Sequence, residues 1–316
     1  NGPAALAASL AGCRRTVPLT VLLFAALGAV CWSSEALSPS PPPPRIFDGL
    51  AEGLAEAIGR AGLPGEHSGA IVTALLTGRR GALPRETTAI FRSSGAAHLL
   101  ALSGLHLGVI YLILSRLLSP LGNSRAARAL RSAVTVGLCG IYTLATGAGP
   151  SIVRAFLFIS TGECAKLLRM RRIKPAGTLS LALTVQLALR PGLISSAGFQ
   201  MSYLAMLGIV ALYPRLEAWY PPGSRHDPMR RIWKAAALSV SCQLFTAPVA
   251  WWHFRTFPRY FLMANLLGLP LTEAVIVTAV ATLLLQAAGI CPGALPRLCG
   301  TLVQALEFCL HAISTM

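Results

Sequence analysis

The stretch HLLALSGLHLGVIYLILSRLL, residues 98–118, is long and apolar enough to cross a membrane as a single helix. A bilayer core about 30 Å thick needs about 20 mostly apolar residues at the helical rise. His98, Ser103 and His106 nevertheless lie within it. Polar side chains inside a span usually face the interior of a helix bundle or a water-filled path. The stretch therefore predicts a membrane helix that contributes polar groups to an interior.

The rest of the chain has the same apolar character. Of its 316 residues, 54% are hydrophobic and only 12% are charged, whereas about a quarter of a soluble domain is charged. The same length rule predicts further spans at 16–32, 129–146, 151–168, 176–189, 194–213, 235–252 and 260–288, the last interrupted by Pro270. Residues 298–313 are a weaker candidate, because Glu307 and His311 also suit an amphipathic surface helix.

These spans predict an all-α fold class, a polytopic transmembrane helix bundle with broken helices and short amphipathic surface helices. Pro39 and Pro41–Pro44 predict a stiff spacer after the first span. Beyond it, Ile46, Leu50, Leu54 and Ile58 recur every four residues, which indicates an amphipathic helix on the membrane surface or against the bundle. Residues 70–77 are too short to span and predict a second helix of this kind.

The net charge of +16 has two explanations. A basic surface attracts a polyanion such as nucleic acid, whereas Lys and Arg also hold cytoplasmic loops on their own side of a membrane. The second explains most of the charge, because basic and nearly neutral loops alternate when Arg14 and Arg15 lie in the cytoplasm. The basic loops carry Arg116, Arg125, Arg128 and Arg131, then Arg169, Arg171, Arg172 and Lys174, then Arg215, Arg225, Arg230, Arg231 and Lys234. The N-terminus is therefore expected in the cytoplasm and residues 33–97 outside.

Polar residues interrupt the apolar sequence in four places, and the first is within 98–108. Ser103 and His106 are three residues apart, so on a helix they share a face. Gly104 and Gly108 have the spacing of small residues that lets another helix or a substrate approach the backbone. On spacing alone, hydrogen-bonded packing between helices is favoured over a functional path.

The second polar cluster is GAGPSIVR at 147–154. Its Gly and Pro residues predict a break between helices, with Ser151 placed to cap the next helix and Arg154 in the first turn. The free N–H groups of a broken helix can hold an anion. A tight turn with a snorkelling arginine explains the pattern equally well.

Later spans supply the other two clusters, which comprise Gln200, Ser202 and Tyr203, then Gln243, the aromatic run 251–254 and Asn265. Aromatic residues at the end of a span fit an interfacial belt. They also suit a surface that stacks nucleobases, although the belt is the better interpretation for any one of them.

Four ordered segments resemble the membrane domain of the ComEC competence proteins. HLLALSGLHLG at 98–108 is similar to that family's signature, and GAGPSIVRAFLF at 147–158 to its SPSxxRA segment. RPGLISSAGFQMSYLAMLGI at 190–209 is similar to its DPxxxxxxGFQLSFxAxxGL segment, and QLFTAPVAWWHF at 243–254 with ANLLGLPL at 264–271 to its segment ending in ANLLAIPL. With the similar stretch at 73–100, the resemblance covers roughly residues 46–290. The resemblance is specific because several segments match and they occur in the same order as in the family.

The resemblance implies an inner-membrane channel that passes single-stranded DNA into the bacterial cytoplasm during natural transformation. It implies a transport channel and not an enzyme, with membrane lipid around it and no cofactor or metal. An external DNA receptor and a cytoplasmic helicase-like motor are the implied partners, and a homo-oligomer is left open. The DNA path that it implies consists of His98, Ser103, Gly104, His106, Ser151, Arg154, Gln200, Ser202, Gln243 and Asn265. An outer funnel is expected from Arg79, Arg80, Arg85 and Arg92, although solvated loop charge is a simpler account.

The resemblance also divides the chain. Residues 1–32 are expected to be an N-terminal transmembrane anchor and 33–97 an outward proline-rich linker with amphipathic helices. Residues 98–290 would be the competence-type channel domain, and 291–316 a C-terminal helix that spans or lies on the membrane. The family's OB-fold domain and metallo-β-lactamase-like nuclease domain are not recognisable, because 33–97 is short for an OB-fold and no H-x-H-x-D-H motif occurs.

Departures from the family pattern keep two alternatives open. Gly149 stands where the family usually has Ser, Arg190 where it has Asp, and Arg255-Thr256 where it has Gly-Gln. One alternative is a small-solute secondary transporter, which also uses broken helices and polar groups at the midplane. The other is an intramembrane serine protease in which Ser103 would pair with His253 or His311.

Overall fold

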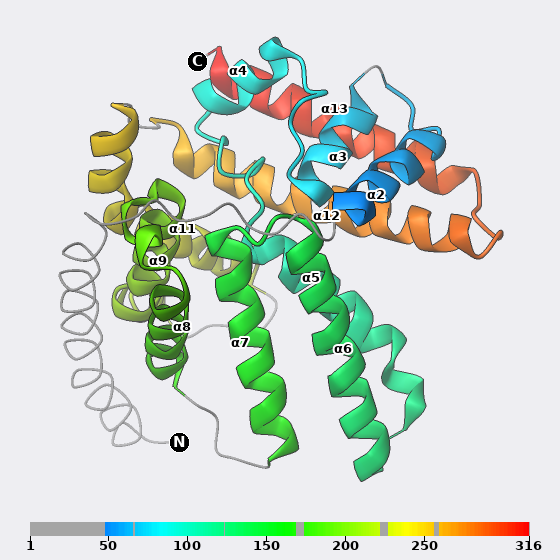
Figure 1. The fold of residues 1–316 in the computed structure, drawn as a ribbon. Helices are drawn as coiled ribbons and strands as arrows, with labels where there is room; N and C mark the ends of the chain where they lie inside the picture. The colour runs from blue at the N-terminus through cyan, green and yellow to red at the C-terminus, as the bar shows by residue number, and fades with distance from the viewer. Residues whose placement is uncertain are drawn as a thin grey trace. The chain divides into compact units, whose positions relative to one another are not determined.

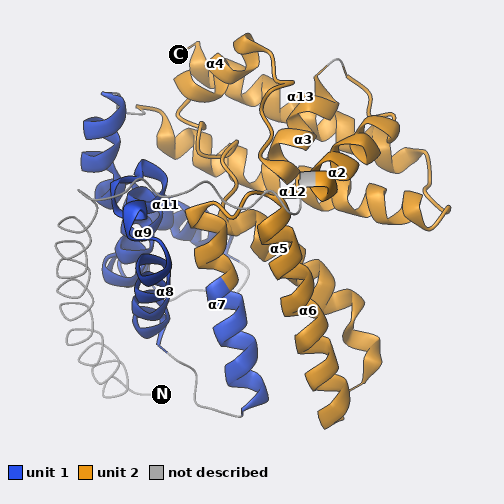
Figure 2. Ribbon diagram, in the orientation of Figure 1, with its two compact units in different colours: residues 1–42, 157–257 blue, residues 43–156, 258–316 orange. Residues whose placement is uncertain are grey.

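The structure is a computed structural model that describes residues 48–65, 67–122, 124–168, 174–221, 227–255 and 259–315. Within these ranges every regular element is helical, so the all-α fold class is confirmed (Figure 1). The described residues form two compact units, one within 157–257 and the other within 43–156 and 258–316 (Figure 2). The expected first span at 16–32 and the proline-rich spacer lie outside the described residues.

The larger unit, residues 43–156 with 258–316, is built on helices from both ends of its sequence. Its elements are α2 (Asp48–Arg60), α3 (Ser68–Thr77), α4 (Arg85–Ser93), α5 (Gly104–Leu117), the 3₁₀ turn η2 (Ser119–Leu121), α6 (Arg125–Ala145), the start of α7 (Pro150–Leu167), α12 (Phe261–Ala287) and α13 (Ala294–Ser314). Its core joins α3 to α12 and α13 through Ile71, Leu75, Ile276 and Leu306, all almost fully buried.

Helix α3 is buried more completely than the amphipathic helix, on the membrane surface or against the bundle, that was expected at 70–77. Ile71, Val72, Ala74, Leu75 and Leu76 are all buried, so the helix is enclosed on most of its circumference. A helix that is apolar all round belongs in a core and not at an interface. It ends at Gly78, whose φ of 74° is the left-handed conformation that glycine adopts without cost.

Helices α2 and α13 each bury one face. In α2, Ala51 and Ile58 are buried and Leu54 is half-buried, whereas Leu50 of the expected apolar stripe is 51% exposed, so the helix is amphipathic but buries only part of that stripe. In α13, Cys299, Val303, Leu306 and Leu310 form the buried face and Phe308 lies exposed on the opposite side. Residues 298–313 therefore form a helix with one buried and one exposed face.

Helix α5 begins at Gly104, so residues 98–103 precede the helix instead of forming its first turns. Its C-terminal end leads through η2 into α6, and the two helices pack as a hairpin. Arg116 lies in the last turn of α5, and Arg125 and Arg128 lie in the first turn of α6. The basic residues therefore gather at one end of the hairpin, and the polar cluster Ser103 and His106 lies at the other.

The smaller unit, residues 157–257, contains the end of α7, α8 (Pro175–Leu189), the 3₁₀ turn η3 (Pro191–Ser195), α9 (Ala197–Ala211), α10 (Tyr213–Ala218) and α11 (Pro228–Phe254). Leu183, Leu187, Phe199 and Tyr203 are the centre of its core. The expected span at 194–213 corresponds to α9 and the start of α10, which are separated by Leu212 alone, and η3 precedes them. Helix α12 continues through Pro270 as a single helix of 27 residues.

Helix α11 begins where side chains satisfy its first backbone groups. The Asp227 carboxylate accepts a hydrogen bond from the backbone N–H of Met229 at 3.0 Å, and Pro228 occupies the first helical position. The Tyr220 hydroxyl donates to the same carboxylate at 2.8 Å. This hydrogen bond lowers the pKa of Asp227, since it stabilises the charged form.

Three helices in the described ranges are long and apolar enough to cross a membrane. They comprise Gly104–Leu121, Ala197–Ala218 and Phe261–Ala287. Only 11%, 28% and 33% of their apolar windows are buried inside the structure, so most of their apolar surface faces outward. Contact with lipid would remove that surface from water, as expected of a membrane protein.

One long-range hydrogen bond in the larger unit offers a stability test. The Tyr142 hydroxyl on α6 donates to the carbonyl oxygen of Leu76 at 2.6 Å, in the last turn of α3, where carbonyls have no partner within the helix. We expect Tyr142→Phe to lower the unfolding free energy by about 1 kcal/mol, measured by denaturation in detergent micelles. Tyr260→Phe, at the start of α12, is the matched control. An equal loss in both variants would contradict the role of this bond.

Candidate functional site

The turn into α5 brings Ser103 and His106 together. The Ser103 hydroxyl oxygen accepts the backbone N–H of Leu105 at 3.3 Å, and the Ser103 backbone N–H donates to His106 Nδ1 at 3.1 Å. This reciprocal arrangement is a capping box, which satisfies free N–H groups at the start of a helix. The two residues were expected to share a helix face. Ser103 instead lies before the helix, because it caps it.

The proximity of Ser103 and His106 bears on the protease alternative. The Ser103 Oγ lies 2.9 Å from His106 Nδ1, so the histidine beside this serine comes from the next turn and is neither His253 nor His311. Nδ1 has one lone pair, and the Ser103 backbone N–H already donates to it. The pair therefore serves as a helix cap, which leaves the nitrogen poorly placed to act as a base toward the hydroxyl.

Helix α7 approaches the first turn of α5 at Gly104. A Cβ atom on Gly104 would lie 3.2 Å from the Ala155 Cβ and 3.5 Å from Nη2 of Arg154. A side chain at this position would therefore press on α7. At Gly108 no atom lies within 4 Å of such a Cβ, so only the first glycine of the expected pair mediates a close approach. The guanidinium of Arg154 consequently lies beside the capped end of α5.

The turn before α7 places Ser151 differently from the expectation. Gly147 and Ala148 both have positive φ, at 84° and 47°, and the helix begins at Pro150. Ser151 is therefore the second residue of α7 and not its cap. The reason is that proline, with its fixed φ and no N–H to leave unsatisfied, favours the first helical position. The backbone N–H groups of Ile152 and Val153 both donate to the Gly149 carbonyl, at 3.1 and 3.0 Å.

His98 and Asn265 form the second polar contact of the larger unit. His98 Nδ1 lies 3.2 Å from the Gly95 carbonyl oxygen, and its other polar neighbour is the Asn265 side chain on α12. Asn265 Oδ1 and His106 Nε2 are buried polar atoms that have no hydrogen-bond partner among the described residues. Buried polar atoms are usually paired, so both atoms are exceptions within the described ranges.

In the smaller unit Gln200 connects η3, α9 and α11. Its Nε2 donates to the Ile194 carbonyl at 2.7 Å, and its Oε1 lies 3.0 Å from Nε2 of His253. Ser202 is buried two residues further along α9, and Gln243 is half-buried on α11. His253 was not among the residues expected in the path. The signal in the sequence that could have identified His253 was its position within the aromatic run 251–254.

A buried acidic residue on α7 was also missed. Glu163 is only 8% exposed, and its Oε1 lies 2.6 Å from Nζ of Lys166 one turn later. Carboxylates within apolar helices are costly unless paired. The three-residue spacing of an acidic and a basic residue in the span at 151–168 was the signal, and it predicts this ion pair.

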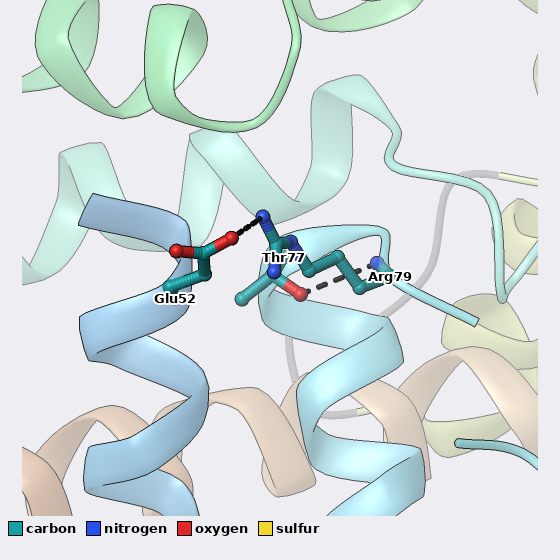
Figure 3. Close-up of polar contacts among 3 residues, drawn as sticks. All are labelled: Glu52, Thr77 and Arg79. Atoms are coloured by element: carbon teal, nitrogen blue, oxygen red, sulfur yellow. Dashed lines mark hydrogen bonds and ion pairs between the residues drawn. The ribbon is translucent and has the colours of Figure 1, made fainter. Parts of the chain in front are cut away.

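The four arginines of the expected outer funnel are all exposed. Among the described residues, Arg79 differs from the other three because it forms an ion pair, in which its guanidinium lies 3.1 Å from the carboxylate of Glu52 on α2 (Figure 3). Its backbone N–H also donates to the Thr77 hydroxyl at 3.2 Å. Exposed ion pairs contribute about 0–1 kcal/mol, but the pair does offset the charge of Arg79. The larger share of a funnel would therefore fall to Arg80 with Arg85 and Arg92, which flank and occupy α4.

Comparisons with known proteins identify the family of the chain. The family described as Competence protein matches residues 75–316, which include the polar clusters of both units. ComE operon protein 3 of Bacillus subtilis (strain 168) is 27% identical over 227 residues, which cover 71% of this chain and 27% of that protein. No solved structure matches the chain significantly.

Two further relatives carry no functional name. An uncharacterized protein of Aquifex aeolicus (strain VF5) is 29% identical over 199 residues, covering 60% of this chain and 43% of that protein. The uncharacterized protein YcaI of Escherichia coli (strain K12) is 26% identical over 214 residues, covering 66% and 28%. The chain thus spans less than half the length of each relative.

Proposed function

This chain belongs to the competence protein family, and from that premise we propose that it takes part in DNA uptake as the membrane channel for single-stranded DNA. The family match spans residues 75–316 and therefore includes the capped turn at Ser103 and the start of α7. The observation that carries the proposal is the approach of Arg154 to this turn, 3.5 Å from the Cβ position of Gly104. There a cation lies beside the N-terminus of α5 and its capping residues.

The chemistry of the substrate explains this choice of residues. Single-stranded DNA carries about one negative charge per nucleotide, and bare charges do not cross hydrocarbon. Phosphates are held by arginine and by the free N–H groups of helix N-termini. Passage also requires contacts that are weak and repeated, because one tight site would trap the strand. Separated polar groups, with one arginine among neutral side chains, suit this requirement.

We propose that each unit by itself presents polar residues that contact DNA. The larger unit would supply His98, Ser103, Gly104, His106, Ser151, Arg154 and Asn265, and the smaller unit Gln200, Ser202 and Gln243. Residues 98–290 would form the channel domain in the bacterial inner membrane, with the N-terminus in the cytoplasm. Single-stranded DNA, an external receptor and a cytoplasmic motor are the proposed partners, with Arg80, Arg85 and Arg92 guiding DNA from outside.

Complementation tests this proposal. A competent strain that lacks its own channel gene is supplied with this chain, and internalised DNA is measured as label that resists external nuclease. We expect restored uptake, with the internal label in single strands. Membrane insertion is checked on the same cells by protease protection. Normal abundance and insertion with no internal label would refute the proposed channel activity.

A further inference from the structure

The segment Trp251-Trp252-His253-Phe254-Arg255 ends helix α11, and we call it the aromatic platform. Trp251 is 54% exposed, Trp252 72% and Phe254 47%, so three large aromatic side chains face outward within one helical turn. Three exposed aromatic rings so close together offer a surface on which a partner can stack. The question is which partner covers it.

Arg255 gives the platform a cation fixed beside an aromatic face. It ends α11 in the left-handed conformation, with φ 53°, and its backbone N–H donates to the Trp251 carbonyl at 3.0 Å. This turn carries the guanidinium over the indole of Trp252, with 5.8 Å between Cζ and the ring centroid. A planar cation is thereby placed next to an exposed π-face.

His253 fixes the platform to the neighbouring helix. Its Nε2 lies 3.0 Å from Oε1 of Gln200 on α9, and the Gln200 amide is itself fixed by the carbonyl of Ile194 at 2.7 Å. Gln200 is one of the residues proposed to line the path. The platform therefore adjoins the proposed lining within one compact unit.

We propose that the aromatic platform binds single-stranded DNA by stacking nucleobases on Trp252 while Arg255 contacts the adjacent phosphate. This inference rests on the proposed function and assigns it a binding site. Base stacking on aromatic residues is tolerant of sequence, because every base has a π-face. A planar guanidinium adds both stacking and a charge for the phosphate. A surface of this kind suits a transporter that accepts any DNA sequence.

The geometry favours DNA over a lipid belt. Residues on a helix are about 100° apart, so Trp252 and Phe254 point about 200° apart around α11. Both are exposed, so aromatic groups face nearly opposite sides of the helix. An interfacial belt arranges its indoles toward the surrounding headgroups, whereas a strand that passes around a helix end can contact both sides. The stacked Arg255 also presents its charge at the same place.

A binding experiment with and without bases tests the proposal. The full chain in lipid nanodiscs is titrated into a labelled oligo(dT) and into an abasic oligonucleotide of the same length, and the dissociation constants are obtained from fluorescence anisotropy. Wild-type protein is expected to bind oligo(dT) about tenfold more tightly than the abasic strand, because stacking contributes a factor of this order per base. Trp252→Ala should remove most of this preference and leave abasic binding nearly unchanged.

Matched variants separate stacking from loss of structure. Trp252→Phe retains an aromatic face and should retain much of the preference. Trp219→Ala removes an indole that is also 72% exposed, at the end of α10, and should change neither constant. Arg255→Ala should weaken the binding of both oligonucleotides and reduce the slope of log K against log salt by about one.

The outcomes divide cleanly between the two proposals. Equal binding of oligo(dT) and abasic strands by wild-type protein would overturn the platform, and restored uptake in the complementation experiment would still support the channel. If brominated lipids quench Trp252 while Trp252→Ala leaves the oligo(dT) preference intact, the platform is a lipid belt and the inference fails. If the wild-type chain does not restore DNA uptake in the complementation experiment, the proposed channel function itself is refuted.

Discussion

Gly208→Ala should destabilise the packing of α9 against α11 in the smaller unit. A Cβ atom on Gly208 would overlap the backbone carbonyl of Ser241 and lie 3.0 Å from the Phe245 ring. These are atoms of α11, which packs along α9. Because the nearest obstacle is backbone and not a flexible side chain, the two helices must move apart. Overpacking of this kind costs about 1–3 kcal/mol, and Gly208→Leu should cost more.

Gly137→Ala is the matched control for this prediction. Gly137 is an exposed glycine on α6, and no atom lies within 4 Å of its Cβ position. The same substitution should therefore be neutral or stabilise the helix by up to about 1 kcal/mol, because alanine favours the helix over glycine. Denaturation of both variants in detergent micelles compares them directly. Equal stability of Gly208→Ala and wild type would show that α9 and α11 do not approach as described.

Arg154→Ala should reduce DNA uptake by about 10- to 100-fold. The expected loss corresponds to about 1.5–3 kcal/mol for a hydrogen bond to a charged group, and each 1.4 kcal/mol is a factor of ten. Arg154→Lys keeps the charge but loses the planar guanidinium. Its DNA uptake should therefore lie between that of the wild type and that of Arg154→Ala. The measurement is nuclease-resistant internal DNA in cells with equal amounts of inserted protein. Arg128→Ala, an exposed arginine in the first turn of α6, should have no effect.

His106 can be tested separately from the helix that it caps. His106→Ala removes both the imidazole and half of the capping box, so a loss of uptake has two explanations. Glutamine at this position can reach back to the Ser103 N–H as a capping box requires. Reduced uptake in His106→Gln at unchanged stability would assign the imidazole to the path. Wild-type uptake from Arg154→Ala and from His106→Gln, both correctly inserted, would refute the proposed lining.

The sequence predicts elements well where length and composition determine them. The helices at 129–146, 151–168 and 176–189 agree with α6, α7 and α8 to within a few residues. Helix starts were harder to predict, because a serine or a proline can each begin a helix and neighbouring residues decide between them. Ser103 became a cap in front of α5, whereas Pro150 took the first position of α7 and left Ser151 inside the helix.

The sequence could not predict which polar residues meet. Hydrophobic periodicity constrains each helix alone, whereas the pairs Gln200 with His253 and His98 with Asn265 join residues far apart in the chain. Tertiary packing also decided that residues 68–77 form a buried core helix, because α12 and α13 are available to cover them. The four-residue spacing of Gly104 and Gly108 likewise had a consequence only at Gly104, where α7 packs closely.

The apolar stretch 98–118, the loop charges and the ordered segments were sufficient for an all-α membrane bundle of the competence family. Those properties are local, since a bilayer selects helices by length and composition. Only the tertiary structure placed Arg154 beside the capped turn at Ser103 and Arg255 over Trp252. Such contacts depend on how separate helices pack and where each one ends, and no single segment contains that information.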